Sequence, residues 1–84
     1  MKAIIIAVKD LSIPAFMSPG PARAAGQAIR SFIDETNRKE QTNNLYMHPA
    51  DFELWQLAEF DEETGQFENT PKILMRGIDA KQAE

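Results

Sequence analysis

The chain has 84 residues, 43% of them hydrophobic, and a formal net charge of −4. It contains no cysteine, which excludes disulfides and thiolate metal sites. A single domain of this length buries a modest core, and oligomerisation is the route to extra stability that the composition leaves open. An acidic protein does not attract nucleic acid through its mean field, so any such binding requires a local basic patch.

The charge is unevenly distributed along the chain. Residues 1–47 carry six basic and four acidic side chains, whereas residues 48–84 carry three basic and nine acidic side chains. Any patch that binds nucleic acid would therefore have to lie in the first half. The alternative is ordinary scatter of charges around a solvated acidic turn.

The first half predicts one strand and one helix. Residues 3–8 are a β-branched run typical of a central strand, and the run is too short to span a membrane. It also lacks the cleavage-site pattern of a secretory signal. A loop is expected over residues 9–17. A turn at residues 18–21 then begins a helix predicted over residues 21–37, with Pro21 in its first turn and an apolar stripe of period three and four.

The second half predicts a β-hairpin after a polar loop at residues 39–47. The acidic turn at residues 61–65 ends in glycine, as expected of a turn closed in the left-handed region. A return strand follows, then a short strand at residues 72–76, with residues 78–84 as a frayed tail or helical turn. The predicted fold is α+β: one domain over residues 1–84, with a small antiparallel sheet of three or four strands and one helix packed on one face.

Both faces of the first hairpin strand are apolar. Alternation puts Phe52, Leu54 and Phe60 on one face, and Trp55 and Leu57 on the other. One helix can cover only one face. The second face therefore requires the C-terminal tail, the loop at residues 39–47 or a second subunit. A homo-oligomer with Trp55 or Leu57 at its interface is the expectation.

Few residues suggest chemistry. His48 and Asp51 would suit acid–base catalysis, but they equally suit a role at the entry to the strand. The carboxylates at residues 61–63 lack the spacing of a calcium loop. No phosphate-binding glycine loop and no metal-ligand cluster is present in the sequence. These observations favour a non-enzymatic protein without metal or cofactor.

A basic stripe on the predicted helix is the candidate nucleic-acid site. It consists of Arg23, Arg30, Arg38 and Lys39. Asp34 lies four residues from both Arg30 and Arg38, a spacing that favours ion pairs and a plain solvated face instead. The stripe also lacks the interleaved aromatic residues of a single-strand binder. Lys72 and Arg76 are the next choice, since they are predicted to share a strand.

Two groups of residues at fixed spacing carry a family resemblance. They are Ala28-Ile29-Arg30-Ser31-Phe32, Asp34-Glu35 and Asn37-Arg38, then His48-Pro49-Ala50-Asp51-Phe52, Leu54, Leu57, Phe60-Asp61, Glu63-Thr64-Gly65 and Phe67-Glu68. With these residues the chain resembles the small nonstructural protein of gokushoviruses, which are single-stranded DNA phages of the microvirus group. The resemblance covers about residues 1–70. A departure is Ala58, where the family pattern has glycine, and it argues against a backbone bulge there.

The resemblance implies a protein made in the cytoplasm of the infected bacterium and absent from the virion. It implies a role that favours the synthesis and packaging of single-stranded genomes, with a viral or host replication protein as partner and no membrane. Direct binding of single-stranded DNA is the alternative. A third possibility is an acidic regulator that docks on a host protein and touches no DNA.

Overall fold

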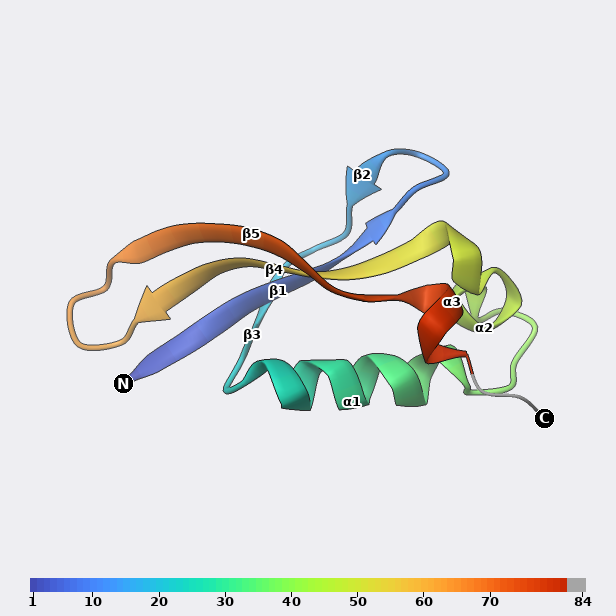
Figure 1. Ribbon diagram of the computed structural model, residues 1–84, viewed down its shortest axis with the longest axis horizontal. Helices are drawn as coiled ribbons and strands as arrows, with labels where there is room; N and C mark the ends of the chain where they lie inside the picture. The colour runs from blue at the N-terminus through green and yellow to red at the C-terminus, as the bar shows by residue number, and fades with distance from the viewer. Residues whose placement is uncertain (82–84) are drawn as a thin grey trace.

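The computed structural model describes residues 1–81 and has the α+β architecture that the sequence predicts. One antiparallel sheet is covered on one face by a helix, and short helical turns gather at one end of the molecule (Figure 1). In chain order the elements are β1 (Lys2–Asp10), β2 (Ala15–Phe16), β3 (Gly20–Ala22), α1 (Ala25–Thr36), α2 (Asn44–Met47), a 3-10 turn (Pro49–Asp51), β4 (Phe52–Asp61), β5 (Phe67–Arg76) and α3 (Gly77–Ala80).

The sheet is built around two long central strands, β1 and β4, in the order β2-β1-β4-β5. The short strand β3 pairs with β1 on the same edge as β2. Ile5 lies opposite Ala58 and Ile6 lies opposite Gln56, so Leu57 has no partner on β1. This extra residue is a β-bulge. The bulge forms although residue 58 is alanine and not the glycine of the family pattern.

The core lies between α1 and the sheet. Ala28 and Phe32 of α1 pack with Leu54 of β4, and Leu54 is only 1% exposed. Gln56 is also buried, and its Nε2 donates a hydrogen bond to Thr70 Oγ1 at 2.9 Å. The buried amide therefore keeps a partner, as a buried polar group requires.

The main helix begins four residues later than the sequence predicts. Pro21, expected in the first helical turn, lies in β3 opposite Ile5. The exposed edge of β1 explains the difference, because its N–H and C=O groups require partners and residues 20–22 supply them. The N–H of Arg23 then donates to Gln27 Oε1 at 3.1 Å, just before α1 begins.

The sheet is larger than the predicted three or four strands, and α1 is not the sole helix. Two short strands, β2 and β3, form in and just after the segment expected to be a loop. The segment expected as two short strands is the single strand β5, which runs through Pro71. Pro71 is tolerated because β5 is the edge strand and because its pairing with β4 shifts register between Asn69 and Lys72, where Pro71 has no partner. Short helices also form within residues 44–51 and 77–80.

Two of the three covers predicted for the second sheet face are wrong. Leu45 of α2 and Ala80 of α3 both pack against the core on the side of α1. Asn37, at the end of α1, fixes α3 there, because its Nδ2 donates to Ala80 O at 2.8 Å. Of the two structures predicted for residues 78–84, a frayed tail or a helical turn, the helical turn forms and extends through Ala80, and residues 82–84 lie outside the described residues. Within residues 1–81, neither cover lies on the sheet face away from α1, which is called the outer face below.

The molecule is elongated, measuring 44 × 24 × 19 Å. The β4–β5 hairpin and the first half of β1 extend beyond the N-terminal end of α1, whereas the opposite end holds α2, α3 and the 3-10 turn (Figure 1). The hairpin end therefore lacks the helical layer. None of the helices formed by residues 1–81 is long and apolar enough to cross a bilayer.

Candidate interaction surfaces

His48 and Asp51 meet through the backbone. The N–H of Asp51 donates to the carbonyl of His48 at 3.0 Å, and Leu11 N–H donates to the carbonyl of Asp51 at 2.8 Å. No hydrogen bond joins the two side chains in the part of the chain that the structure describes. This geometry places both residues at the entry to β4, which is the structural role that the sequence left open.

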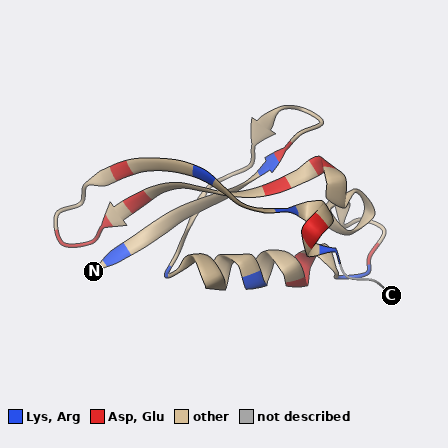
Figure 2. Ribbon diagram, in the orientation of Figure 1, with Lys and Arg blue, Asp and Glu red and all other residues tan. Residues whose placement is uncertain are grey.

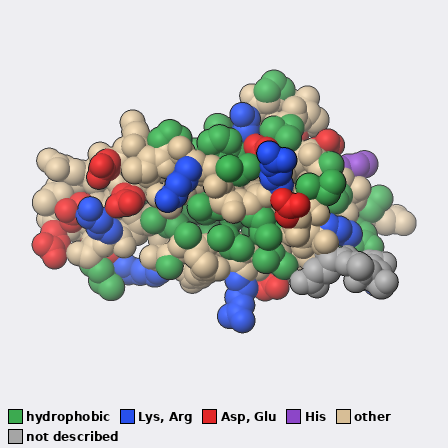
Figure 3. All heavy atoms as spheres, in the orientation of Figure 1, with side chains coloured by type: hydrophobic (Ala, Val, Ile, Leu, Met, Phe, Trp, Pro, Cys, Tyr) green, Lys and Arg blue, Asp and Glu red, His purple; other side chains and the backbone are tan. Residues whose placement is uncertain are grey.

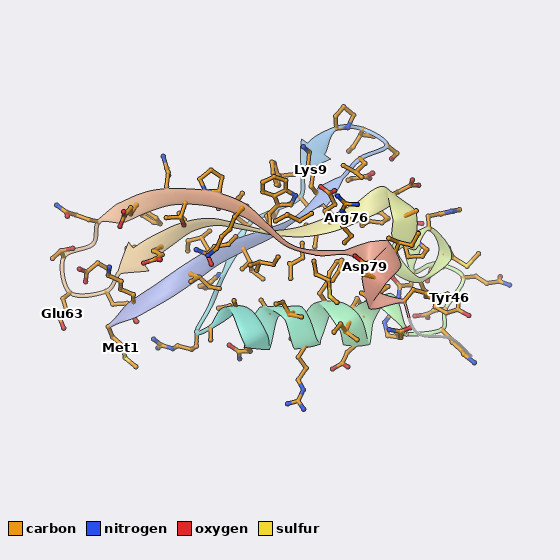
Figure 4. All side chains as sticks on the ribbon, in the orientation of Figure 1. Met1, Lys9, Tyr46, Glu63, Arg76 and Asp79 are labelled. Atoms are coloured by element: carbon orange, nitrogen blue, oxygen red, sulfur yellow. The ribbon has the colours of Figure 1, made fainter. Side chains whose placement is uncertain are left out.

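The acidic turn directs its carboxylates to separate partners. Asp61 Oδ1 accepts the N–H of Glu63 at 2.9 Å, and this bond holds the pKa of Asp61 below its usual range. Glu62 pairs with Arg23 at 2.6 Å, and Glu63 pairs with the amino group of Met1 at 3.4 Å. Met1 and Glu63 are labelled at the hairpin end in Figure 4. Within residues 1–81 no group of three or more His, Cys, Asp or Glu side chains is placed to hold a metal ion.

The four predicted nucleic-acid residues do not form a continuous stripe. Arg23 precedes the helix and pairs with Glu62, while Arg38 lies beyond the helix end and pairs with Glu35 and Glu40. The hydrogen bond between Arg38 and Glu35 raises the pKa of Arg38 and lowers that of Glu35. Arg30 is exposed on α1, and Lys39 is exposed beyond it. The charges of Arg23 and Arg38 are thus matched by carboxylates.

Asp34 is not the residue that neutralises Arg38. The helix ends at Thr36, so the four-residue spacing from Asp34 to Arg38 no longer places the two side chains on one helical face. Among the described residues, Arg38 pairs with Glu35 and Glu40 and makes no ion pair with Asp34. The neutralisation that the sequence suggested occurs with different partners.

The outer face carries an aromatic pair with a cation above it. The rings of Phe16 and Trp55 meet edge to face, with centroids 5.7 Å apart and planes at 88°. Lys9 Nζ lies 5.4 Å from the centroid of Phe16 and 5.6 Å from that of Trp55. The indole N–H of Trp55 donates to Glu53 Oε1 at 3.0 Å. Phe16 therefore covers part of Trp55 from within the same chain, a cover that was not expected from the sequence.

Strand register extends this cluster across the sheet. Lys9 of β1, Glu53 of β4 and Arg76 of β5 lie opposite one another in one row. Within the described residues, neither Lys9 nor Arg76 forms an ion pair. Both are labelled in Figure 4, close together and far from the hairpin tip. Lys9, Phe16, Trp55 and Arg76 are called the aromatic–cation cluster below.

A second surface lies at the hairpin end. The rings of Phe60 and Phe67 are 4.8 Å apart, and Phe67 is 65% exposed. Together with Ile5, Pro21 and residues 19–20 they line a hollow of about 390 Å³. Acidic side chains gather at the hairpin tip, with basic side chains among them (Figures 2 and 3). Ile5, Pro21, Phe60 and Phe67 are called the hairpin-end surface below.

A neighbouring hollow continues this surface toward α1. Its volume is about 430 Å³, and it shares Pro21 and Phe60 with the first hollow. The paired side chains of Arg23 and Glu62 also line it.

The sequence of the chain was compared with those of known families. A family model described as Phage ORF5 protein matches residues 3–80.

The chain belongs to the phage ORF5 protein family. No curated protein and no solved structure matches it. Membership of this phage family confirms that part of the resemblance drawn from the sequence, while the assignment to gokushoviruses stays a prediction. Both surfaces of this ORF5 family member lie within the matched span, as do all four cations of the predicted helix stripe.

Proposed function

We propose that this ORF5 family member is a non-enzymatic phage accessory protein that acts in the synthesis or packaging of single-stranded viral DNA. It works through protein–protein contacts as a homo-oligomer in the cytoplasm of the host bacterium, with a viral or host replication protein as its partner. Membership of the phage family and the resemblance of residues 48–68 to the gokushovirus protein support this role.

The hairpin-end surface is the observation that carries the proposal of self-association. Phe67 is 65% exposed, and its ring packs at a tilt of 40° against Phe60 beside an apolar hollow. An exposed aromatic residue of this kind marks an interaction surface, because its burial removes a large apolar area from water. Among residues 1–81 no cation lines this hollow, so it offers no charged group that would bind a polyanion. A second copy fits better, since a chain of 84 residues gains stability from oligomerisation.

The contact between copies is assigned to side chains and not to the free edge of β5. Pro71 lacks an N–H, and the pairing of β5 with β4 shifts register twice. Proline and bulges are the devices that prevent edge strands from pairing with other chains. Trp55 and Leu57, the interface residues predicted from the sequence, are half-buried, and Phe16 already contacts Trp55. The more exposed Phe67 is therefore the better candidate for the contact.

The test is the balance of viral DNA forms in infected cells. A phage whose copy of this gene is disrupted is expected to accumulate less single-stranded DNA relative to duplex DNA, and the wild-type chain supplied in trans restores the balance. The variant Phe67→Ser is expected not to restore it. Ile78→Ser is the matched control, because Ile78 is 60% exposed on α3, away from the hairpin end. A balance that stays the same when the gene is disrupted would refute the proposed role.

A further inference from the structure

We infer that the aromatic–cation cluster on the outer face binds single-stranded nucleic acid. A base stacks on the Phe16–Trp55 pair, and flanking phosphates contact Lys9 and Arg76. This goes beyond the proposed function, which requires protein partners only. It also assigns nucleic-acid contact to the opposite side of the sheet from the predicted helix stripe.

The aromatic pair supplies a stacking platform. Phe16 is 44% exposed, and the bond from the indole N–H of Trp55 to Glu53 fixes the orientation of the second ring. Proteins that bind single strands without reading their sequence stack bases on such rings, since every base has a π-face. Because the rings are already packed against each other, little side-chain entropy is lost when a base stacks on them.

The cations are placed where phosphates of a stacked strand would pass. Lys9 Nζ lies over both rings, and Arg76 lies in the same row two strands away, roughly 10 Å between backbones at the usual strand spacing. Neither cation has a carboxylate partner in an ion pair within residues 1–81. Glu53 lies between them, and its carboxylate, which accepts the hydrogen bond from Trp55, offsets part of their positive charge.

The exposed face of α1 has fewer groups suited to binding single-stranded nucleic acid. Arg23 and Arg38 are held by carboxylates, which a phosphate would have to displace. Arg30 is exposed but has no ring contact among the described residues. The outer face combines two rings with two cations that form no ion pair within residues 1–81, which is the combination that single-strand binding requires. The net charge of −4 predicts that the binding is moderate and sensitive to salt.

The test uses a 20-nucleotide oligo-dT strand and two readouts. Trp55 is the sole tryptophan of the chain, so quenching of its fluorescence reports stacking at this cluster directly. Anisotropy of dye-labelled DNA reports binding independently. We expect quenching at low salt, with affinity falling as salt rises, and weaker binding of a duplex because its bases cannot reach the rings.

Variants locate the binding surface. The double variant Lys9→Gln, Arg76→Gln is expected to reduce the salt slope by about 0.7 for each phosphate that the protein no longer neutralises. Phe16→Ala, which keeps the reporter Trp55, is expected to weaken binding at least about fivefold. Arg30→Gln is the matched control on the helix and should bind as the wild type does. Circular dichroism confirms that each variant folds.

Three outcomes would overturn the inference: no binding at low salt, binding that disappears in Arg30→Gln but persists in the double variant, or equal affinity for duplex DNA without quenching. The result is separable from the proposed self-association. The Phe67→Ser variant is expected to be monomeric. Oligo-dT should still bind to it and quench the fluorescence of Trp55. A negative result for self-association therefore does not refute binding of single-stranded DNA, and the reverse also holds.

Discussion

At the scale of single residues, Gly77 is where the backbone is packed most tightly. A Cβ at this position would overlap the carbonyl oxygen of Pro49 and lie 3.0 Å from that of Phe52. The close approach of these backbones joins the end of β5 to the start of β4 and lets Ala80 reach the core. The strand predicted to end at residue 76 does end there, but the packing reason for glycine at the next position is visible only in three dimensions.

The variant Gly77→Ala is therefore expected to lower the free energy of unfolding by about 3 kcal/mol, because the obstructing atoms are backbone and cannot turn aside. Urea denaturation followed by circular dichroism measures this. Gly26→Ala is the matched control, since a Cβ there meets nothing within 4 Å and the position is helical. Equal stability of Gly77→Ala and the wild type would contradict the packing described for this residue.

The turn residue Asp61 predicts a dependence of stability on pH. Its pKa is lowered chiefly by the hydrogen bond from the N–H of Glu63, so the folded state favours the carboxylate. The stabilisation is fully present above the unfolded-state pKa of about 3.9 and is lost as pH falls toward the folded-state value. Asp61→Ala should be less stable than the wild type at pH 7, and the difference should shrink below about pH 4. A difference that is constant from pH 7 to pH 3 would contradict this.

At the scale of elements, long periodic segments were predictable and short pairings were not. The β-branched run of β1 and the apolar stripe of α1 carry their own signals. β2 and β3 have two and three residues, and each exists because β1 offers an unpaired edge. No local pattern in residues 15–22 encodes that edge, and proline at positions 14, 19 and 21 argues against strands.

The candidate sites show the same contrast between local patterns, which the sequence reveals, and contacts between distant segments, which it does not. The alternation of β4 correctly placed Leu54 on the buried face and left Trp55 outside the core. The contact of Phe16 with Trp55 depends on the pairing of β2 with β1, so the sequence did not reveal it. The pairing of Arg23 with Glu62 joins residues 39 positions apart. The fold was therefore needed to determine which basic side chains form ion pairs.

The packing of α1 on the sheet is the element contact that the core depends on most. Phe32 is 4% exposed and packs in one cluster with Leu54, Ala28 and Ala80. Phe32→Ala is expected to lower the free energy of unfolding by about 3–5 kcal/mol through reduced burial and a residual cavity. Thermal unfolding compared with that of Ser31→Ala, an exposed neighbour on α1, measures the effect. A decrease below about 1 kcal/mol would show that α1 is not anchored through this residue.

At the scale of the whole molecule, the two surfaces differ in chemistry and place. The hairpin end is apolar, rimmed by carboxylates and without a helical layer, whereas the aromatic–cation cluster lies toward the other end of the sheet (Figures 2 and 4). This separation leaves room for the proposed protein contact and the proposed nucleic-acid contact at the same time.

The mass of the protein in solution tests the central claim of self-association most directly. Light scattering coupled to size exclusion at micromolar concentration is expected to give a multiple of the 9.5 kDa chain mass for the wild type and for Ile78→Ser. Phe67→Ser is expected to give the mass of a single chain, and Trp55→Ala is expected to stay oligomeric. A wild type that elutes with a mass of 9.5 kDa, or a Phe67→Ser variant that keeps the wild-type mass, would contradict the account.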